Sequence, residues 1–198
     1  MKVAIHQPHY LPWRGLLEKW RRADLLIVLD TVQFEKQGWQ NRCKIRTPHG
    51  DQWLTVPVHG RGLLKDIEIA GESWKRTHEK TLDWAYGGMP APLRWVYAGD
   101  WTLLADLAET TMTILRDAAG FDTPMKRASD LGVDATDPTE RLIALCEAVG
   151  ADTYLHGAGA AAYMQPERFI RAGIRLEEVV GVWPPHTALE PVRRTVAA

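Results

Sequence analysis

The stretch Lys2–Asp30, KVAIHQPHYLPWRGLLEKWRRADLLIVLD, decides the fold of this chain. Residues 3–5 and 25–29 are short apolar runs rich in β-branched residues, a pattern typical of strands buried on both faces. Between the two runs, one helical stripe carries four apolar residues, Leu16, Leu17, Trp20 and Ala23. The stretch therefore predicts a strand, a loop, a helix and a second strand.

The loop of this unit, residues 6–13, carries the polar chemistry. Its two prolines exclude helix and leave two imidazoles, an amide, a phenol and an indole at the carboxyl end of a strand. Ligands bind at that edge of an open parallel sheet. We expect five residues to line a site there: His6, Gln7, His9, Tyr10 and Trp13. In the alternative interpretation, Tyr10, Leu11 and Trp13 only close the top of the core.

The second predicted strand ends at Asp30, and a polar loop follows it. A buried carboxylate is costly unless it is paired. Asp30 either forms a structural ion pair with Lys36 or Arg42, or it orients His6 or binds a substrate amine. In the functional interpretation, Asn41 and Arg42 hold a carbonyl or a phosphate. Gln33, Lys36 and Trp39 complete the substrate-binding candidates from this loop.

The two cysteines suit a reducing compartment and exclude a disulfide scaffold. Cys146 shares a helical face with apolar residues and is predicted to be buried. Cys43 lies between Arg42 and Lys44, whose charges would favour a nucleophilic thiolate if they pointed toward it. Strand alternation would instead place both cations on the opposite face.

Further elements follow in order along the chain. Residues 43–46 and 53–58 predict a β-hairpin, and residues 67–69 predict a short edge strand. Ser73 is expected to cap a helix over residues 74–86 that places His78 on its inward face, either as a satisfied structural histidine or as a catalyst. A helix over 102–119, a strand over 125–129 and a helix capped by Asp137 and Pro138 come next.

The last predicted βα unit contains residues 153–155, followed by His156-Gly157-Ala158-Gly159 and a helix. Small residues after a strand let a ligand or a neighbouring helix approach closely. The N-terminus of the helix would offer N–H groups to an anion or oxyanion. Gly157 and Gly159 are therefore candidate binding residues, although close packing explains them equally well. A final strand is predicted over residues 174–180.

Several of these motifs together resemble the WbqC-like protein family. They are HQPHYLPWRG at residues 6–15, DTVQFEKQGWQNR at 30–42, QWLTVPV at 52–58, PTERLIALCEAVGADTYL at 138–155 and GAGAAAYM at 157–164. The likeness covers most of the chain. The C-terminal PPHTALEPVRRTVAA departs from the family pattern.

The resemblance implies a biosynthetic enzyme of surface-polysaccharide or natural-product pathways. We expect a transferase that moves an acyl or aminoacyl group, glycyl being one candidate, from a carrier-protein thioester to a small-molecule amine. His6 is the expected general base, with Asp30 as its orienter and His78 or Cys43 in reserve. A phosphopantetheine-bound acyl donor is the one cofactor this reaction suggests. The alternatives are a nucleotide-dependent transferase of the HIGH-like fold and a ligand-binding module without catalysis.

Length and composition indicate the number of domains and the class of protein. With 198 residues, 45% of them hydrophobic, and a net charge of −1, the chain suits one three-layer α/β domain over residues 1–183. We expect a mostly parallel, Rossmann-like sheet, an inserted β-hairpin and a poorly ordered tail over 184–198. No long apolar run suggests a membrane span, and the charge argues against nucleic acid, so a cytoplasmic protein is expected. Apart from His6 with His9, no metal-ligand spacing appears.

Overall fold

The computed structural model describes residues 1–162 and 164–189 and has an α/β fold with a five-stranded parallel sheet and a separate two-stranded hairpin. Backbone contacts divide the chain into two compact units. Among the described residues, the sheet unit comprises residues 1–7, 18–31 and 122–182, and the hairpin unit comprises residues 8–17, 32–121 and 183–189. The sequence predicted a single domain, and both parts of this α/β fold draw on the stretch Lys2–Asp30.

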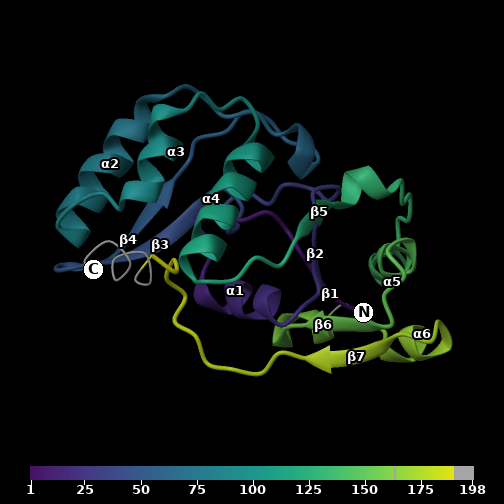
Figure 1. Cartoon of the computed structure of the whole chain (residues 1–198). Coiled ribbons are helices and arrows are strands. Elements are labelled where there is room, and N and C mark those ends of the chain that lie inside the picture. The colour runs from purple at the N-terminus through teal and green to yellow at the C-terminus, as the bar shows by residue number, and fades with distance from the viewer. Residues whose placement is uncertain (163, 190–198) are drawn as a thin grey trace. The chain divides into compact units, whose positions relative to one another are not determined.

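The sheet contains β1 (Lys2–His6), β2 (Leu25–Val28), β5 (Met125–Arg127), β6 (Thr153–His156) and β7 (Arg175–Glu178). All four pairings are parallel, and the spatial order is β5-β2-β1-β6-β7 (Figure 1). The chain builds outward from β1 through β2 to β5, and then returns to the other side of β1 with β6 and β7. The prediction that residues 3–5 form a central strand is confirmed.

This order places a topological switch point between β1 and β6, because successive strands depart from that junction in opposite directions. In open α/β sheets, ligands bind outside the carboxyl ends of the strands at such a point. His6 ends β1 and His156 ends β6. Two histidines therefore flank the position where this type of fold usually binds its ligand.

Both faces of the central strands are buried. Side chains alternate along a strand, and Val3, Ile5 and Tyr154 join a cluster with residues of α5 (Pro138–Ala148) and α6 (Pro166–Arg171). Ala4, Leu26 and Leu155 occupy the opposite face and are fully buried as well. Double-sided burial explains why these strands read as continuous apolar runs. Helix α1 (Arg14–Arg21) connects β1 to β2.

The hairpin unit combines β3 (Arg42–Thr47) and β4 (Gly50–Thr55) with helices α2 (Ser73–Tyr86), α3 (Arg94–Ala98) and α4 (Leu104–Ala118) (Figure 1). The hairpin is antiparallel, with Cys43 opposite Leu54. Short 3-10 helices are η1 (Leu64–Asp66) and η2 (Ala91–Leu93) here, and η3 (Ala128–Leu131) and η4 (Ala158–Ala162) in the sheet unit. Across the described residues, no helix combines the length and apolarity that crossing a bilayer requires.

Several local predictions need correction. Ser73 is the first helical residue of α2, and no side chain caps this helix. Ile69 forms only an isolated bridge with Val58 in place of the predicted edge strand. In the segment predicted to be a tail, Thr187 donates its amide to the Lys44 carbonyl and Ala188 donates to the Pro12 carbonyl. The rest of that segment, residues 190–198, lies outside the described residues. The cap predicted at Asp137 is present, since its carboxylate accepts from the Glu140 amide at 2.8 Å.

Candidate functional site

His6 lies half-buried at the carboxyl end of the central strand. Its Nδ1 is 3.0 Å from the backbone carbonyl oxygen of Gln7. A carbonyl oxygen can only accept, so Nδ1 must carry the proton. In the neutral ring, Nε2 then holds the lone pair and can accept a proton. The sequence assigned this choice of tautomer to Asp30, whereas in the structure the Gln7 carbonyl determines it.

His156 repeats this arrangement at the end of the neighbouring strand. Its Nδ1 is 3.2 Å from the Gly157 carbonyl, so its Nε2 is also the acceptor in the neutral ring. The carbonyl of His156 accepts from the Val179 amide, which fixes the backbone at this end of the sheet. The sequence analysis placed His156 beside the candidate glycines without giving it a role, although its position after a buried strand matches that of His6.

Asp30 is fully buried just after β2, and both of its carboxylate oxygens bind Ser129. Oδ1 accepts from the Ser129 amide at 3.0 Å, and Oδ2 accepts from its hydroxyl at 2.6 Å. Ser129 belongs to the first turn of η3, so the carboxylate satisfies amide and hydroxyl donors at the start of that helix. Neither Lys36 nor Arg42 is its partner. The carboxylate thus ties the end of β2 to the segment that follows β5.

Gly157 and Gly159 border open space. A Cβ atom built on either glycine would meet no atom within 4 Å. Close packing therefore does not account for these two glycines; Gly159 is exposed and Gly157 is half-buried. The helix predicted after them is only η4, a short 3-10 helix, and α6 does not begin until Pro166. A long helix whose N-terminus could hold an oxyanion is thus absent from this position among the described residues.

Lys19 is a residue of the sheet unit whose role the sequence reasoning missed. It is only 6% exposed, and its ammonium donates to the Ile5 carbonyl at 2.9 Å. The apolar stripe predicted for its helix did not include Lys19. Its spacing of three residues after Leu16 and four before Ala23 was the available signal, because these intervals place it on the buried stripe.

In the hairpin unit, Tyr10 belongs to a buried hydrogen-bonded chain. Its hydroxyl is 2.9 Å from Nδ1 of His78 and 2.6 Å from the hydroxyl of Tyr97. Trp74 packs edge-on against the Tyr10 ring. The backbone of Thr55 also hydrogen-bonds His78, and since a carbonyl can only accept, the ring donates there and accepts from Tyr10 at Nδ1. Tyr97 then donates to Tyr10.

In this series of hydrogen bonds, both ring nitrogens of His78 are occupied. The side chain is 3% exposed, and burial lowers its pKa to about 4. A neutral imidazole that already uses both nitrogens has neither a free lone pair nor a free proton for a substrate. The geometry is that of the satisfied structural histidine, which was one of the two roles considered for this residue.

The rest of the proline-rich loop is also packed within the hairpin unit. His9 is buried, and its amide lies 3.5 Å from the Met112 sulfur. Leu11 has a left-handed backbone with φ of 47°, and its amide donates to the Thr111 hydroxyl. The Trp13 ring covers Gly15, where a Cβ would come within 2.1 Å of it. Tyr10 and Leu11 are therefore buried in the hairpin unit, whereas Trp13 is half-buried beside Gly15.

The candidate residues of the loop after Asp30 differ in exposure and in the groups they contact. Gln33 and Lys36 are exposed. Trp39 packs against Trp53 with a centroid separation of 5.0 Å. The Arg42 guanidinium lies 4.2 Å from the centroid of the Trp53 ring and donates to the carbonyls of Gln37 and Gly38. Arg42 therefore stabilises its own loop.

Asn41 is buried and half satisfied. Its Nδ2 donates to the Val56 carbonyl at 2.8 Å, whereas its Oδ1 has no hydrogen-bond partner among the described residues. A buried polar atom without a partner costs stability, so Oδ1 is an unused acceptor in the hairpin unit.

Cys43 faces inward from β3 and is 2% exposed. Burial raises the pKa of its thiol far above its usual range, so a thiolate is disfavoured. Arg42 and Lys44 alternate to the other face, where both lie over the Trp53 ring. The arrangement is the one that strand alternation predicts, and it lacks the positive surroundings that a reactive cysteine needs.

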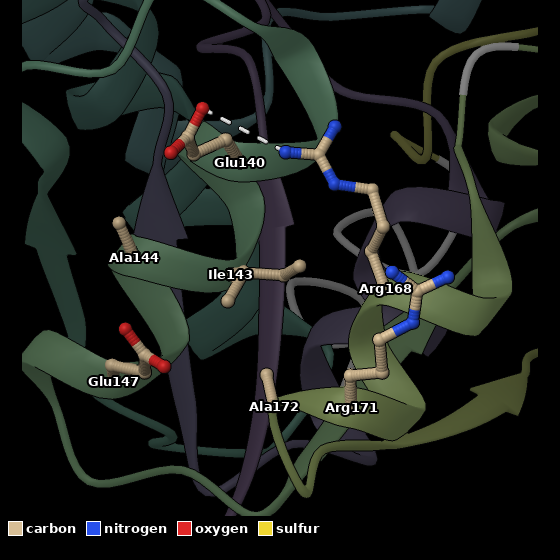
Figure 2. Close-up of a pocket in the computed structure, with 7 residues that line it drawn as sticks. All are labelled: Glu140, Ile143, Ala144, Glu147, Arg168, Arg171 and Ala172. Atoms are coloured by element: carbon tan, nitrogen blue, oxygen red, sulfur yellow. Dashed lines mark ion pairs between the residues drawn. The ribbon is translucent and has the colours of Figure 1, made fainter.

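A surface hollow of about 440 Å³ lies between α5 and α6 in the sheet unit (Figure 2). Its lining mixes charges: the Arg168 guanidinium is 3.7 Å from the Glu140 carboxylate, and Glu147 and Arg171 lie further along the two helices. None of the residues predicted from the sequence to form the site lines it. Among the described residues, no group of three or more His, Cys, Asp or Glu side chains is placed to hold a metal ion.

Comparison with known proteins gives a family match and one curated relative. Residues 7–180 match the model of the WbqC-like protein family. A protein of Mycobacterium tuberculosis (strain ATCC 25618 / H37Rv), described as uncharacterized protein Rv1507c, is 31% identical over 189 residues, which cover 88% of this chain and 80% of the relative. No solved structure matches the chain.

Proposed function

Because the chain belongs to the WbqC-like protein family, and because its sheet places two histidines at a topological switch point, we propose that it is an acyl or aminoacyl transferase that forms an amide. The donor is a carrier-protein thioester bearing a phosphopantetheine arm, and the acceptor is a small-molecule amine. A glycyl group is the first donor to test. The setting is natural-product or surface-sugar biosynthesis.

The single observation that carries the proposal is the placement of His6. It ends the central strand of a sheet whose order reverses beside it, and its Nδ1 is committed to the Gln7 carbonyl. With the proton on Nδ1, Nε2 is the ring nitrogen that carries the lone pair a general base uses. The open space beside Gly157 and Gly159, on the neighbouring strand's loop, supports a ligand at the same end of the sheet.

The reaction needs one base and then one acid. An acceptor ammonium loses a proton to Nε2 of His6, and the free amine attacks the thioester carbonyl to form the C–N bond. The C–S bond breaks as the tetrahedral intermediate collapses. The nitrogen loses a second proton as the intermediate collapses. One of the two protons goes to the leaving thiolate and the other passes from His6 to solvent, so the products are the amide, the carrier thiol and one proton.

The test uses the full chain with a carrier protein loaded with a glycyl thioester and a panel of amino sugars. Release of the carrier thiol is measured, together with amide formation by mass spectrometry. His6→Ala should lower turnover by roughly 10²- to 10⁴-fold, the range expected for loss of a general base. His49→Ala, which changes an exposed histidine of the hairpin, should leave turnover unchanged. Equal turnover in His6→Ala and the wild type, with native unfolding, would overturn the role of His6.

A nucleotide-dependent transferase of the HIGH-like fold is the second candidate, because the five strands, numbered along the chain, have the order 3-2-1-4-5, which matches five of the six strands of the doubly wound nucleotide-binding fold. Thermal unfolding distinguishes the two functions. Stabilisation by ATP or CTP, without stabilisation by the loaded carrier protein, would favour the nucleotide. Stabilisation by neither, together with no thiol release, would favour a binding module with another ligand.

A further inference from the structure

Lys19 is a buried cation with unused hydrogen-bonding capacity. Its side chain is in the protein interior, and its single hydrogen bond among the described residues goes to the Ile5 carbonyl. An ammonium has three N–H donors, so two remain for another group. No carboxylate of the described residues forms an ion pair with it. Buried charges are normally paired, which makes this arrangement unusual for a purely structural lysine.

The direction of the Ile5 carbonyl locates the ammonium. Backbone carbonyls point alternately to the two sides of a strand. On β1, the carbonyls of Lys2 and His6 accept from residues Asp24 and Leu29 on the β2 side. The Met1 carbonyl accepts from Asp152 on the β6 side. Ile5 lies four positions after Met1, and carbonyls an even number of positions apart point to the same side. The Ile5 carbonyl is therefore directed toward β6.

The pairing of β1 with β6 ends at Ala4 and Leu155, one residue before Ile5. The Ile5 carbonyl thus lies just beyond the paired part of the two strands. The Lys19 ammonium donates to this carbonyl at the position where a β6 amide would donate if the pairing continued. Its ammonium is consequently at the junction of β1 and β6, on the carboxyl side, which is the switch point of the sheet.

The charges around the junction leave the ammonium uncompensated. The titratable groups at the ends of β1, β6, β2 and β7 are His6, His156, Asp30 and Glu178. The carboxylate of Asp30 is committed to Ser129, and Glu178 is exposed at the end of β7. Burial alone lowers the pKa of Lys19, to about 7. An anion next to the ammonium would reverse that effect by favouring the charged form.

We propose that Lys19 forms an anion-binding subsite at the β1–β6 switch point, where its ammonium holds a phosphate-type or carboxylate oxygen group of the ligand. The ammonium is fixed by the Ile5 carbonyl and offers its remaining N–H donors to that group. The subsite rests on the sheet geometry and not on acyl transfer. It would hold an anionic part of whichever ligand binds beside His6.

Isothermal titration of the full chain with sulfate and with acetate at about pH 6.5 tests this subsite and distinguishes a tetrahedral from a carboxylate oxyanion. Sulfate or acetate should bind the wild type, and Lys19→Met should lose at least tenfold in affinity for the same anion. Lys19→Arg should retain binding, and Lys80→Met, which removes an exposed lysine of α2, should bind as the wild type does. Circular dichroism and thermal unfolding verify that each variant is folded.

Equal binding by the wild type and folded Lys19→Met, or binding of neither anion by the wild type, would overturn the subsite. The pH dependence gives an independent measurement, because sulfate keeps the same charge between about pH 6.5 and 9. Wild-type affinity should fall by up to tenfold per pH unit above about 7, since the amine loses its charge there. Lys19→Arg should show a flat profile. A flat wild-type profile would also contradict the proposal. None of these measurements requires turnover, so the outcome is independent of the transferase assay.

Discussion

The Tyr10 hydroxyl donates a 2.9 Å hydrogen bond to Nδ1 of His78, whose imidazole is buried. Burial lowers the pKa of His78 to about 4 from an ordinary value of 6.5. The unfolded state therefore binds more protons than the folded state between these two values. The contribution of His78 to the free energy of unfolding should be fully present above about pH 6.5 and should be lost as the pH falls toward 4.

This loss should amount to about 3 kcal/mol, because each unit of pKa difference corresponds to about 1.4 kcal/mol. Urea unfolding at closely spaced pH values measures it. His78→Gln has no titrating ring, so its stability should change much less over the same window. Parallel pH profiles for the wild type and His78→Gln would contradict the assignment.

Tyr10 and Tyr97 should differ when each loses its hydroxyl. Tyr10→Phe deprives both His78 and Tyr97 of a buried partner, whereas Tyr97→Phe leaves Tyr10 still donating to His78. Unsatisfied buried polar groups cost about 1–3 kcal/mol each. Tyr10→Phe should therefore lower the free energy of unfolding by the larger amount, measured by urea unfolding at about pH 7.5. A larger loss in Tyr97→Phe would reverse the assigned donor order.

Asp30 and Ser129 should act as a structural pair. Asp30→Ala removes the acceptor for two donors of Ser129, while Ser129→Ala removes only the hydroxyl and leaves the amide bonded. We expect Asp30→Ala to lower the free energy of unfolding by roughly 2–4 kcal/mol. Ser129→Ala should lower it by about 1 kcal/mol less than Asp30→Ala does. A double-mutant cycle gives their interaction energy. Additive losses would show that the two residues act independently.

Lys19 should make stability rise with pH. Its amine titrates near 10.5 when unfolded and near 7 in the folded protein, so the unfolded state binds more protons between these values. Stability should increase from about pH 7 upward, by up to about 5 kcal/mol if the whole range were accessible. Urea unfolding between about pH 7 and 9.5 should show this rise in the wild type. Lys19→Met should be more stable at pH 7 and should lack the rise.

Cys43 should be inert in the folded protein. Its thiol is buried and its pKa is raised, so both access and ionisation are unfavourable. Iodoacetamide should modify Cys43 only as fast as the hairpin unit opens, which peptide mass spectrometry can follow over time. Cys43→Ala should lower stability without lowering turnover in the thiol-release assay. Rapid alkylation of the native protein would restore Cys43 as a candidate nucleophile.

The sequence by itself determined the local periodicities and the elements that follow from them. The apolar runs at residues 3–5 and 25–29 indicated strands buried on both faces, and both are central in the sheet. Asp137 followed by Pro138 identified a capped helix start. These signals succeed because strand burial and helix capping depend on residues within a few positions of one another.

The partners of the buried polar groups were decided only by the tertiary structure. Asp30 binds Ser129, 99 residues away, and Tyr10 binds His78, 68 residues away. Residues such as Lys36 and Arg42 were plausible partners for Asp30 because they are near in sequence, but proximity along the chain does not select a partner across a sheet. Lys19 gives the clearest case: its helical spacing shows burial, yet only the strand order places its ammonium at the junction of β1 and β6. Strand order results from packing of the whole sheet, and no local pattern encodes it.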